Sequence, residues 1–391
     1  MEKISTSLDL VDSANTRYGS ARVRARPEGR TRSASTPCGC GKTPVISLQT
    51  VRRQRRGYVT GFVSSGERKV PVVSTRLSWR DILGGWKVRW DIGRSHYAVL
   101  PGLYAVGSPG TDSPVMVTAN YKLTFDKLRR ELGSIDAWIL VLDTKGVNVW
   151  CAAGKGTFGT RELEQRIMAV KLQDVVSHRT LILPQLGATG VSAWEVKRDS
   201  GWQVKYGPVR ARDIRAFLSS GLRKNNEMRR ILFPLTERMA IAPTELVQSW
   251  PLLLGIAVVS ALLGLPLDAG YMGRLLGVGL PLLGAVAVGT LLLPALLPYV
   301  PFRAFSLKGA LLGALWGIAV SLVVRASLPG AAALTLMAMP IAAFLSMNFT
   351  GSSTFTSQPG AALEVKRGLI PMISSLTIGL GLAVVTRILP L

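Results

Sequence analysis

The sequence has 391 residues, a net charge of +24 and a mean hydropathy of +0.30. Such a basic chain is usually polar, so the charged and the apolar residues are expected to lie in different parts. Residues 250–391 hold only seven of the 47 Lys and Arg side chains and two of the 23 acidic side chains. This distribution excludes a single soluble globule, an intrinsically disordered protein and a small disulfide-rich scaffold.

Three cysteines are too few for a four-Cys zinc or iron–sulfur site within one chain. Cys38, Cys40 and Cys151 are therefore expected to act singly, as structural, redox-active or metal-binding thiols. Cys38 and Cys40 stand one residue apart, and two ligands make half a metal site at best, so we expect no structural metal there. No apolar run follows Met1, and we expect no secretory signal.

Residues 1–44 form a basic tail in which arginines alternate with Ser, Ala, Gly and Pro. With almost nothing to bury, this tail is expected to be disordered. Its charge serves solubility in the simplest interpretation, or attraction to anionic lipid or nucleic acid in a sharper one. We favour the first interpretation and expect no nucleic-acid partner.

Residues 45–200 alternate short apolar runs with amphipathic stretches. The predicted helices cover 124–132 and 160–178. The predicted strands cover 58–63, 70–74, 115–118, 137–142, 147–150 and 181–183. Strand, helix and strand in succession predict an α/β, Rossmann-like domain.

Residues 201–249 are expected to form a basic connector that approaches a membrane as helix. The apolar stretches that follow it cover residues 251–267, 275–299, 307–324, 331–347 and 369–389. Each approaches the roughly 20 residues that a helix needs to cross a bilayer. We therefore expect residues 250–391 to form an all-α transmembrane domain of five helices.

Lys and Arg beside the first span set its orientation. The basic connector therefore predicts a multi-pass protein of the cell (inner) membrane, with residues 1–249 cytoplasmic and the C-terminus outside. Carboxylates and histidines are missing from the middle of the predicted spans, which argues against a proton-coupled transporter.

The stretch Gly146–Thr160 holds the most informative chemistry. Cys151 directly follows a predicted strand, and small residues follow it before the next predicted helix begins. A thiol at such a junction lies near helix N–H groups and near Lys155, and both favour thiolate. Thiolate is the form that binds a metal or attacks an electrophile.

Three chemistries are compatible with these residues. A phosphate-binding loop does not fit the GxxxxGK[ST] pattern, because Gly156 follows Lys155 and Val149 stands where a glycine is required. A nucleophilic cysteine needs a base, and no spacing rule links His96 or His178 to Cys151. The third is a single axial thiolate to a cofactor metal. The residues alone do not decide among the three.

The segment Asn148-Val-Trp-Cys151-Ala-Ala-Gly-Lys155 resembles the cap-region signature of the membrane-bound corrinoid protein of microbial mercury methylation. The resemblance extends over about residues 85–391. Further matching segments are 88–94, 101–104, 113–122, 183–190 and 347–354. The soluble part also resembles the large subunit of the corrinoid iron–sulfur protein of acetyl-CoA synthesis, whose four-Cys cluster module this chain lacks.

The resemblance implies a corrinoid of the cobalamin type, bound against the strand ends, with Cys151 as the lower axial ligand to cobalt. It implies a methyltransferase that passes methyl from cobalt to Hg(II) and forms methylmercury. A strong thiolate donor suits this reaction, because it pushes electron density through the metal toward the departing methyl group. The alternatives are a corrinoid methyl carrier of one-carbon or acetyl-CoA metabolism and a non-catalytic membrane scaffold that binds corrinoid.

The cofactor-binding residues implied are those around Cys151 and those that follow two other strands. Asn148 and Trp150 are expected to fix the cap segment, and Lys155 to tune Cys151 or meet a corrinoid side chain. The full set is Asn120, Asn148, Val149, Trp150, Ala152, Ala153, Gly154, Lys155, Gly156, Thr157, Gly187, Ala188, Thr189 and Gly190.

The resemblance also implies partners, because three cysteines are too few for an iron–sulfur cluster on this chain. No iron–sulfur cluster is expected on this chain, so electrons should come from a ferredoxin-like protein with two [4Fe–4S] clusters. Methyl groups should come from an enzyme that uses methyltetrahydrofolate, with Hg(II) as substrate and membrane lipid around the helices. Cys38 and Cys40 could relay Hg(II).

Overall fold

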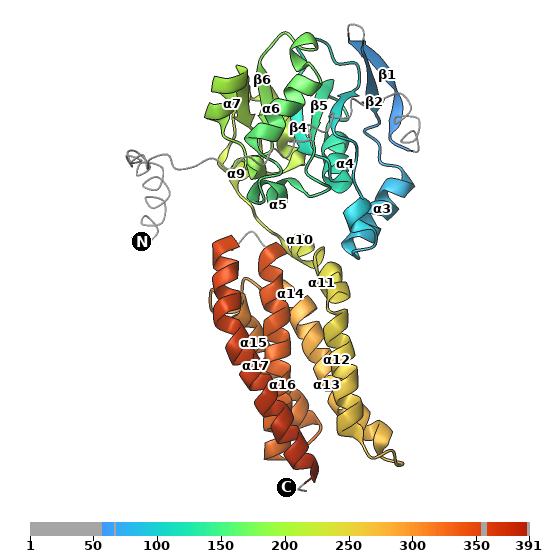
Figure 1. Ribbon diagram of the computed structural model, residues 1–391, viewed down its shortest axis with the longest axis vertical. Coiled ribbons are helices and arrows are strands. Elements are labelled where there is room, and N and C mark those ends of the chain that lie inside the picture. Colours follow the sequence, from blue (N-terminus) through green and yellow to red (C-terminus); the bar gives the residue numbers. More distant parts are fainter. Residues whose placement is uncertain (1–56, 66–67, 353–357, 389–391) are drawn as a thin grey trace, which may run out of the picture. The chain divides into compact units, whose positions relative to one another are not determined.

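The computed structural model describes residues 57–65, 68–352 and 358–388 (Figure 1). The predicted basic tail, with Cys38 and Cys40, lies outside the described residues. The described chain begins with a sheet and its helices and ends in a series of long apolar helices.

A mixed sheet of seven strands forms the first part, in the order β1-β2-β3-β5-β4-β6-β7. The pairs β5–β4, β4–β6 and β6–β7 are parallel. The pairs β3–β5 and β1–β2 are antiparallel. The strands are β1 (Val59–Ser65), β2 (Arg68–Val73), β3 (Gly102–Val106), β4 (Val115–Ala119), β5 (Ala137–Leu142), β6 (Thr180–Leu183) and β7 (Gln203–Tyr206).

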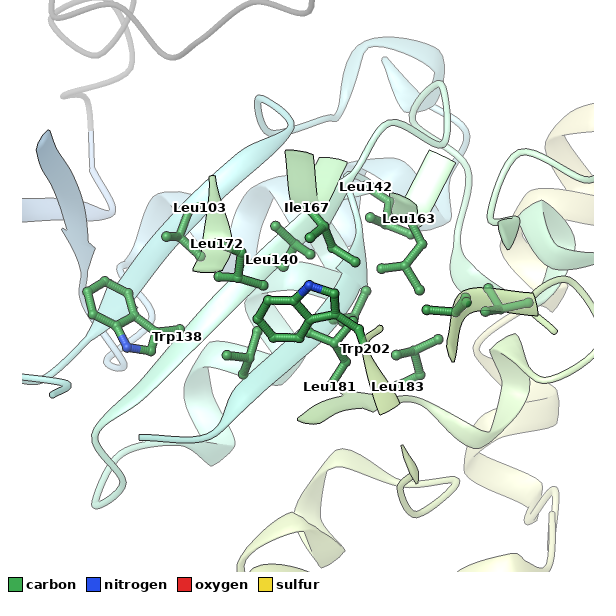
Figure 2. Packing of buried hydrophobic residues seen from close by; sticks show 14 of the residues in the cluster. Leu103, Trp138, Leu140, Leu142, Leu163, Ile167, Leu172, Leu181, Leu183 and Trp202 are labelled. Atoms are coloured by element: carbon green, nitrogen blue, oxygen red, sulfur yellow. The ribbon is translucent and has the colours of Figure 1, made fainter. Parts of the chain in front are cut away.

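Helices cover both faces of this sheet, and β5 shows why. All six of its residues are buried, and alternate side chains enter two different clusters. Trp138, Leu140 and Leu142 pack with helix α6 (Thr160–Ala169) and with Trp202 (Figure 2). Ile139 and Val141 share the other cluster with α4 (Lys122–Glu131) and α8 (Ile214–Ser219). The predicted α/β architecture is confirmed at this level.

Two predicted elements differ from the structure. The strand predicted at 147–150 is wrong, because Asn148 caps a short helix, α5 (Val149–Gly154). The helix predicted over 160–178 stops at Ala169, because Lys171 adopts a left-handed backbone (φ +45°) before the turn η2 (Leu172–Asp174). Helix α3 (Trp79–Arg89) and strand β3 were not predicted.

The sheet continues beyond residue 200, into the stretch expected to be a connector. Strand β7 follows helix α7 (Ala193–Ser200) and pairs with β6, and Phe217 of α8 is fully buried. The many basic residues of this stretch led to the prediction of a connector, so the apolar positions of β7 and α8 were not recognised. The short helices that follow are α9 (Asn226–Arg229), α10 (Leu235–Met239) and α11 (Ala242–Gln248).

In the described part of the chain, four helices are long and apolar enough to cross a membrane. They span Tyr271–Leu296, Phe305–Val323, Leu328–Asn348 and Gly360–Thr386. A fifth span is possible if Leu235–Gln248 and Trp250–Gly264, bent by 55°, count as one. The elements are α12 (Trp250–Gly264), α13 (Tyr271–Ala287), η5 (Val288–Leu292), α14 (Leu293–Leu296), α15 (Phe305–Val323), α16 (Leu328–Asn348) and α17 (Gln358–Ile388).

Glycines at four-residue spacing let α15 approach α16 closely. A Cβ on Gly313 would lie 2.8 Å from the Cβ of Ala342, and one on Gly317 would lie 2.6 Å from the Cα of Thr335. Small residues allow such backbone approach in helices that pack in lipid. Helix α17 begins eleven residues earlier than the predicted stretch and so includes Glu364, which accepts a hydrogen bond from the Ser306 N–H.

Candidate cofactor site

The candidate site lies at the carboxyl ends of the parallel strands β4, β5 and β6. Asn120 follows β4, the turn 143–148 follows β5, and the segment 184–191 follows β6. Parallel strands end at the same edge of a sheet, which is where α/β proteins commonly bind ligands. The structure therefore brings the three predicted groups of site residues to one edge.

Asn148 and Cys151 form the local centre of this edge. The Asn148 Oδ1 accepts a hydrogen bond from the Cys151 backbone N–H at 3.0 Å and caps the first turn of α5. The Asn148 Nδ2 lies 3.5 Å from the Cys151 Sγ and donates to it. One side chain thus fixes the helix start and orients the thiol, which is free and half-buried.

Cys151 is a single metal-binding side chain, which suits a metal whose other ligands come from a cofactor. Within the described residues, no group of three or more His, Cys, Asp and Glu side chains could hold a bare metal ion. A single thiol is a sufficient protein ligand only where a macrocycle already supplies the others. Cys151 therefore fits a corrinoid cobalt better than an ion bound by protein side chains alone.

Asn120 is a buried hub of the turn that precedes α5. Its Oδ1 accepts hydrogen bonds from the Thr144 N–H (3.2 Å), the Thr144 hydroxyl (2.8 Å) and the Gly146 N–H (2.9 Å). Its Nδ2 donates to the Asp143 Oδ1 at 3.2 Å. The amide that was predicted to meet the corrinoid periphery is thus engaged within the protein, where it sets the course of the chain from β5 into α5.

The small residues serve close packing between α5 and the segment after β6. A Cβ on Gly190 would lie 2.8 Å from the Ala153 Cα, and one on Gly187 would lie 2.5 Å from the Phe158 ring. Ala152 and Ala153 are themselves buried in the sheet core. Gly154, Lys155 and Gly156 are exposed, with Gly156 in a left-handed backbone (φ +78°).

A cavity of about 490 Å³ adjoins α5 at this edge. Three of the predicted residues, Asn148, Val149 and Trp150, line it, whereas Cys151 does not. Four cationic side chains that were not among the predicted site residues also line it: Lys127, Arg130, Arg210 and Arg212. Burial lowers the pKa of Lys127, and the nearby Arg89 acts in the same direction. Glu131 and Glu237 line the same cavity and pair with Arg130 at 2.8 Å and with Arg210 at 3.1 Å, so its lining carries charges of both signs.

Comparisons with known proteins relate this part of the chain to corrinoid proteins. Residues 91–218 match a family described as the CO dehydrogenase/acetyl-CoA synthase delta subunit. The acetyl-CoA decarbonylase/synthase complex subunit gamma of Archaeoglobus fulgidus is 35% identical over 127 residues, 32% of this chain and 27% of that protein. The corrinoid/iron-sulfur protein large subunit of Moorella thermoacetica is 29% identical over 194 residues, 46% of this chain and 41% of that protein.

The similarity covers only part of this chain and only part of each relative. This chain spans about a quarter of the length of the gamma subunits that it matches. The matched family region includes Asn120, Cys151 and Gly190 but ends before the apolar helices begin. The expectation that this chain is a relative of corrinoid proteins is confirmed.

Proposed function

We propose that this chain is a membrane-anchored corrinoid protein that delivers a methyl group from cobalt to Hg(II), with Cys151 as the lower axial ligand. The observation that supports it most is the position of Cys151. A single oriented thiol stands at the carboxyl edge of the parallel strands, within the region that is similar to corrinoid proteins. The cap segment around it also has the sequence signature that resembles the mercury-methylating proteins.

Cys151 is the residue that would determine the chemistry. A bound corrinoid would supply a cobalt–carbon bond, and Cys151 would supply a thiolate whose electron donation favours departure of the methyl group with carbanion character. Hg(II) is an electrophile and requires a methyl group of that kind. The protein contributes the ligand, its orientation through Asn148, and a half-buried setting that limits access of water.

The remaining residues hold the site. Trp150 and Val149 present apolar surface to the cavity, and Asn120 fixes the turn from which α5 starts. Lys127 and Arg212 would meet oxygen atoms on the side chains of the corrinoid, whereas Arg210 pairs with Glu237. The exposed Gly154, Lys155 and Gly156, with Thr157, and the exposed Thr189 beside Ala188 remain proposed contacts for its periphery.

A second function has direct support from the comparisons. The relatives described above are named as subunits of acetyl-CoA decarbonylase/synthase complexes or as a corrinoid/iron-sulfur protein. This chain would then be a methyl carrier of one-carbon metabolism, with a different acceptor for the same methyl group. In either function we propose a separate ferredoxin-like protein with two [4Fe–4S] clusters as reductant and a methyltetrahydrofolate-dependent enzyme as methyl donor.

We also propose that the apolar helices cross the inner membrane five times, with α12 in the first span, and that the α/β part faces the cytoplasm. The cationic residues between β7 and α12 support this orientation, since Lys and Arg accumulate on the cytoplasmic side of the first span. Reporter fusions after residue 249 and after residue 391 test it. The first should be active as a cytoplasmic reporter and the second as a periplasmic one.

A single-turnover experiment distinguishes the two acceptors. The full chain, loaded with corrinoid carrying an isotopically labelled methyl group, is mixed without oxygen either with Hg(II) or with an acetyl-CoA synthase, CO and coenzyme A. Labelled methylmercury in the first mixture supports the main proposal. Labelled acetyl-CoA alone supports the methyl carrier. If the label stays on the corrinoid in both mixtures, the result supports a scaffold without chemistry.

Two variants make this experiment specific for the site. Cys151→Ala should abolish methyl transfer to Hg(II). The matched control is Cys38→Ala/Cys40→Ala, which removes the other two thiols that could bind Hg(II) and leaves Cys151 in place. If the control loses activity and Cys151→Ala keeps it, Cys151 is not the functional thiol.

A further inference from the structure

Helix α3 turns its apolar side chains outward. Trp79, Ile82, Leu83 and Trp86 have exposed fractions between 41% and 67%. Their spacing of three, four and seven residues places them on one side of the helix, which we call the α3 face. A water-soluble helix usually buries such a stripe, so a contiguous exposed one indicates an interaction surface.

The opposite side of α3 is fixed to the α/β part. The Asp81 carboxylate lies 2.5 Å from the Lys122 Nζ and 2.9 Å from the Arg129 Nη2, both on α4. Ser78 and Asp81 also form a capping box at the start of α3. Helix α3 cannot rotate its apolar stripe inward without breaking these buried ion pairs.

Cationic side chains border the α3 face. Arg80 and Lys87 are exposed and stand seven residues apart, on the same flank of the helix. The Arg80 guanidinium lies 5.4 Å from the centre of the Trp79 ring. A short helix with Trp and aliphatic residues on one side and Arg or Lys beside them is typical of helices that lie in a membrane interface.

Hydrogen bonds place the end of α3 beside the start of the apolar helices. The Thr244 hydroxyl of α11 donates to the Arg89 carbonyl at 2.7 Å, and the Gln248 Nε2 donates to the Asp91 Oδ2 at 3.2 Å. Helix α12 begins two residues after Gln248, at Trp250, which is 64% exposed. Along α12, exposed apolar residues continue at four-residue spacing: Trp250, Leu254, Val258 and Leu262.

We propose that α3 is an interfacial helix. Its apolar face lies at the boundary between headgroups and acyl chains of the membrane that the apolar helices cross, with Arg80 and Lys87 at anionic headgroups. This inference rests on the proposed transmembrane placement of α12–α17. Together with Trp250, the Trp79 and Trp86 rings would form an aromatic belt at the cytoplasmic surface. The α/β part is thereby held at a fixed height and tilt on the lipid surface.

Fluorescence quenching by brominated lipid tests this placement on the full chain. The native chain and Trp79→Phe/Trp86→Phe are placed in nanodiscs of phosphatidylcholine and phosphatidylglycerol, with or without bromine on the acyl chains. Subtracting the two emission spectra isolates the light from Trp79 and Trp86, while phenylalanine preserves the apolar face. Bromine should reduce this difference emission about twofold or more, because interfacial helices sit only about 5–10 Å deep.

Two matched variants separate the possible outcomes. Trp194, on α7, is 68% exposed and serves as a control whose emission, isolated with Trp194→Phe, bromine should leave unchanged. Trp250→Phe reports whether α12 enters lipid. Quenching of Trp250 without quenching of Trp79 and Trp86 overturns the inference, because the α3 face then lies outside the lipid. If Trp250 also stays unquenched, the membrane placement fails as well.

Discussion

The side-chain amide of Asn148 contacts both the backbone and the sulfur of Cys151. Its oxygen accepts from the Cys151 N–H at 3.0 Å, and its nitrogen lies 3.5 Å from the Sγ. An amide that caps a helix and faces a thiol couples the position of that thiol to the start of the helix. In the proposed function, Asn148 is therefore a positioning residue for the cobalt ligand.

Two substitutions at Asn148 separate these roles. Asn148→Ala should remove the cap and lower the free energy of unfolding by about 1 kcal/mol. Asn148→Asp keeps an oxygen acceptor for the Cys151 N–H but turns a carboxylate toward the sulfur. It should therefore weaken corrinoid binding while the melting temperature stays close to that of the native protein. Corrinoid titration and thermal unfolding of both variants check this. Equal corrinoid affinity in native protein and Asn148→Asp would contradict it.

Asn120 is expected to contribute mainly to the free energy of unfolding and less to cofactor binding. Asn120→Ala removes the four hydrogen bonds of this side chain and leaves the Gly146 N–H without its acceptor, while the Thr144 N–H and hydroxyl keep the Leu142 and Val147 carbonyls; the loss should cost about 3 kcal/mol. Asn225→Ala is the control, since it removes a single capping bond to the Met228 N–H and should cost about 1 kcal/mol. Similar melting temperatures for the two variants would contradict the role of Asn120 as a hub.

Gly190 is expected to tolerate no side chain. In Gly190→Ala the new methyl group would lie 2.8 Å from the Ala153 Cα and closer still to the Phe158 carbonyl oxygen, which forces α5 away from the segment after β6. We expect about 1–3 kcal/mol of destabilisation and a weaker corrinoid complex. Gly61→Ala on β1 is the control, because nothing lies within 4 Å of its added Cβ. A Gly190→Ala protein with native affinity and melting temperature would show that this approach is not required.

The pH dependence of stability should reveal Asp81. Burial alone would raise the pKa of Asp81, but hydrogen bonds and charge from Lys122, together with hydrogen bonds from Ser78, lower the pKa to about 2. A lowered pKa stabilises the fold above the ordinary value of 3.8, and that stabilisation is lost as the pH falls from about 4 to about 2. The advantage of native protein over Asp81→Asn should shrink by about 2 kcal/mol across this window. Thermal unfolding at pH 6, 4 and 2.5 measures it; a constant advantage would contradict it.

The sheet core could be predicted from sequence because its signal is local. Residues 137–142 form an unbroken apolar run, and the structure confirms them as the buried strand β5. Residues 147–150 looked equally β-like, but the capping bond from Asn148 to the Cys151 N–H outweighs the β-preference of Val147 and Val149. A four-residue stretch with apolar side chains at alternate positions, such as Val147 and Val149, does not by itself distinguish a strand from the first turn of a helix.

The site could be predicted only in part, for a similar reason. Cys151 and its neighbours form one continuous segment, so their association did not depend on the fold. Lys127, Arg210 and Arg212 reach the cavity from α4 and from beyond β7, and no sequence pattern joins those positions. Asn120 was expected beside the ligand because it ends a strand, but its hydrogen bonds depend on the turn after β5, a different part of the chain.

X-ray absorption at the cobalt edge tests the central claim most directly. The full chain and Cys151→Ala are each reconstituted with corrinoid in detergent, and the ligands of cobalt are determined for both. The account predicts one sulfur in the first shell of cobalt in the native chain and none in Cys151→Ala. A native spectrum without sulfur, or the same sulfur contribution in both proteins, would contradict the assignment of Cys151 as the axial ligand.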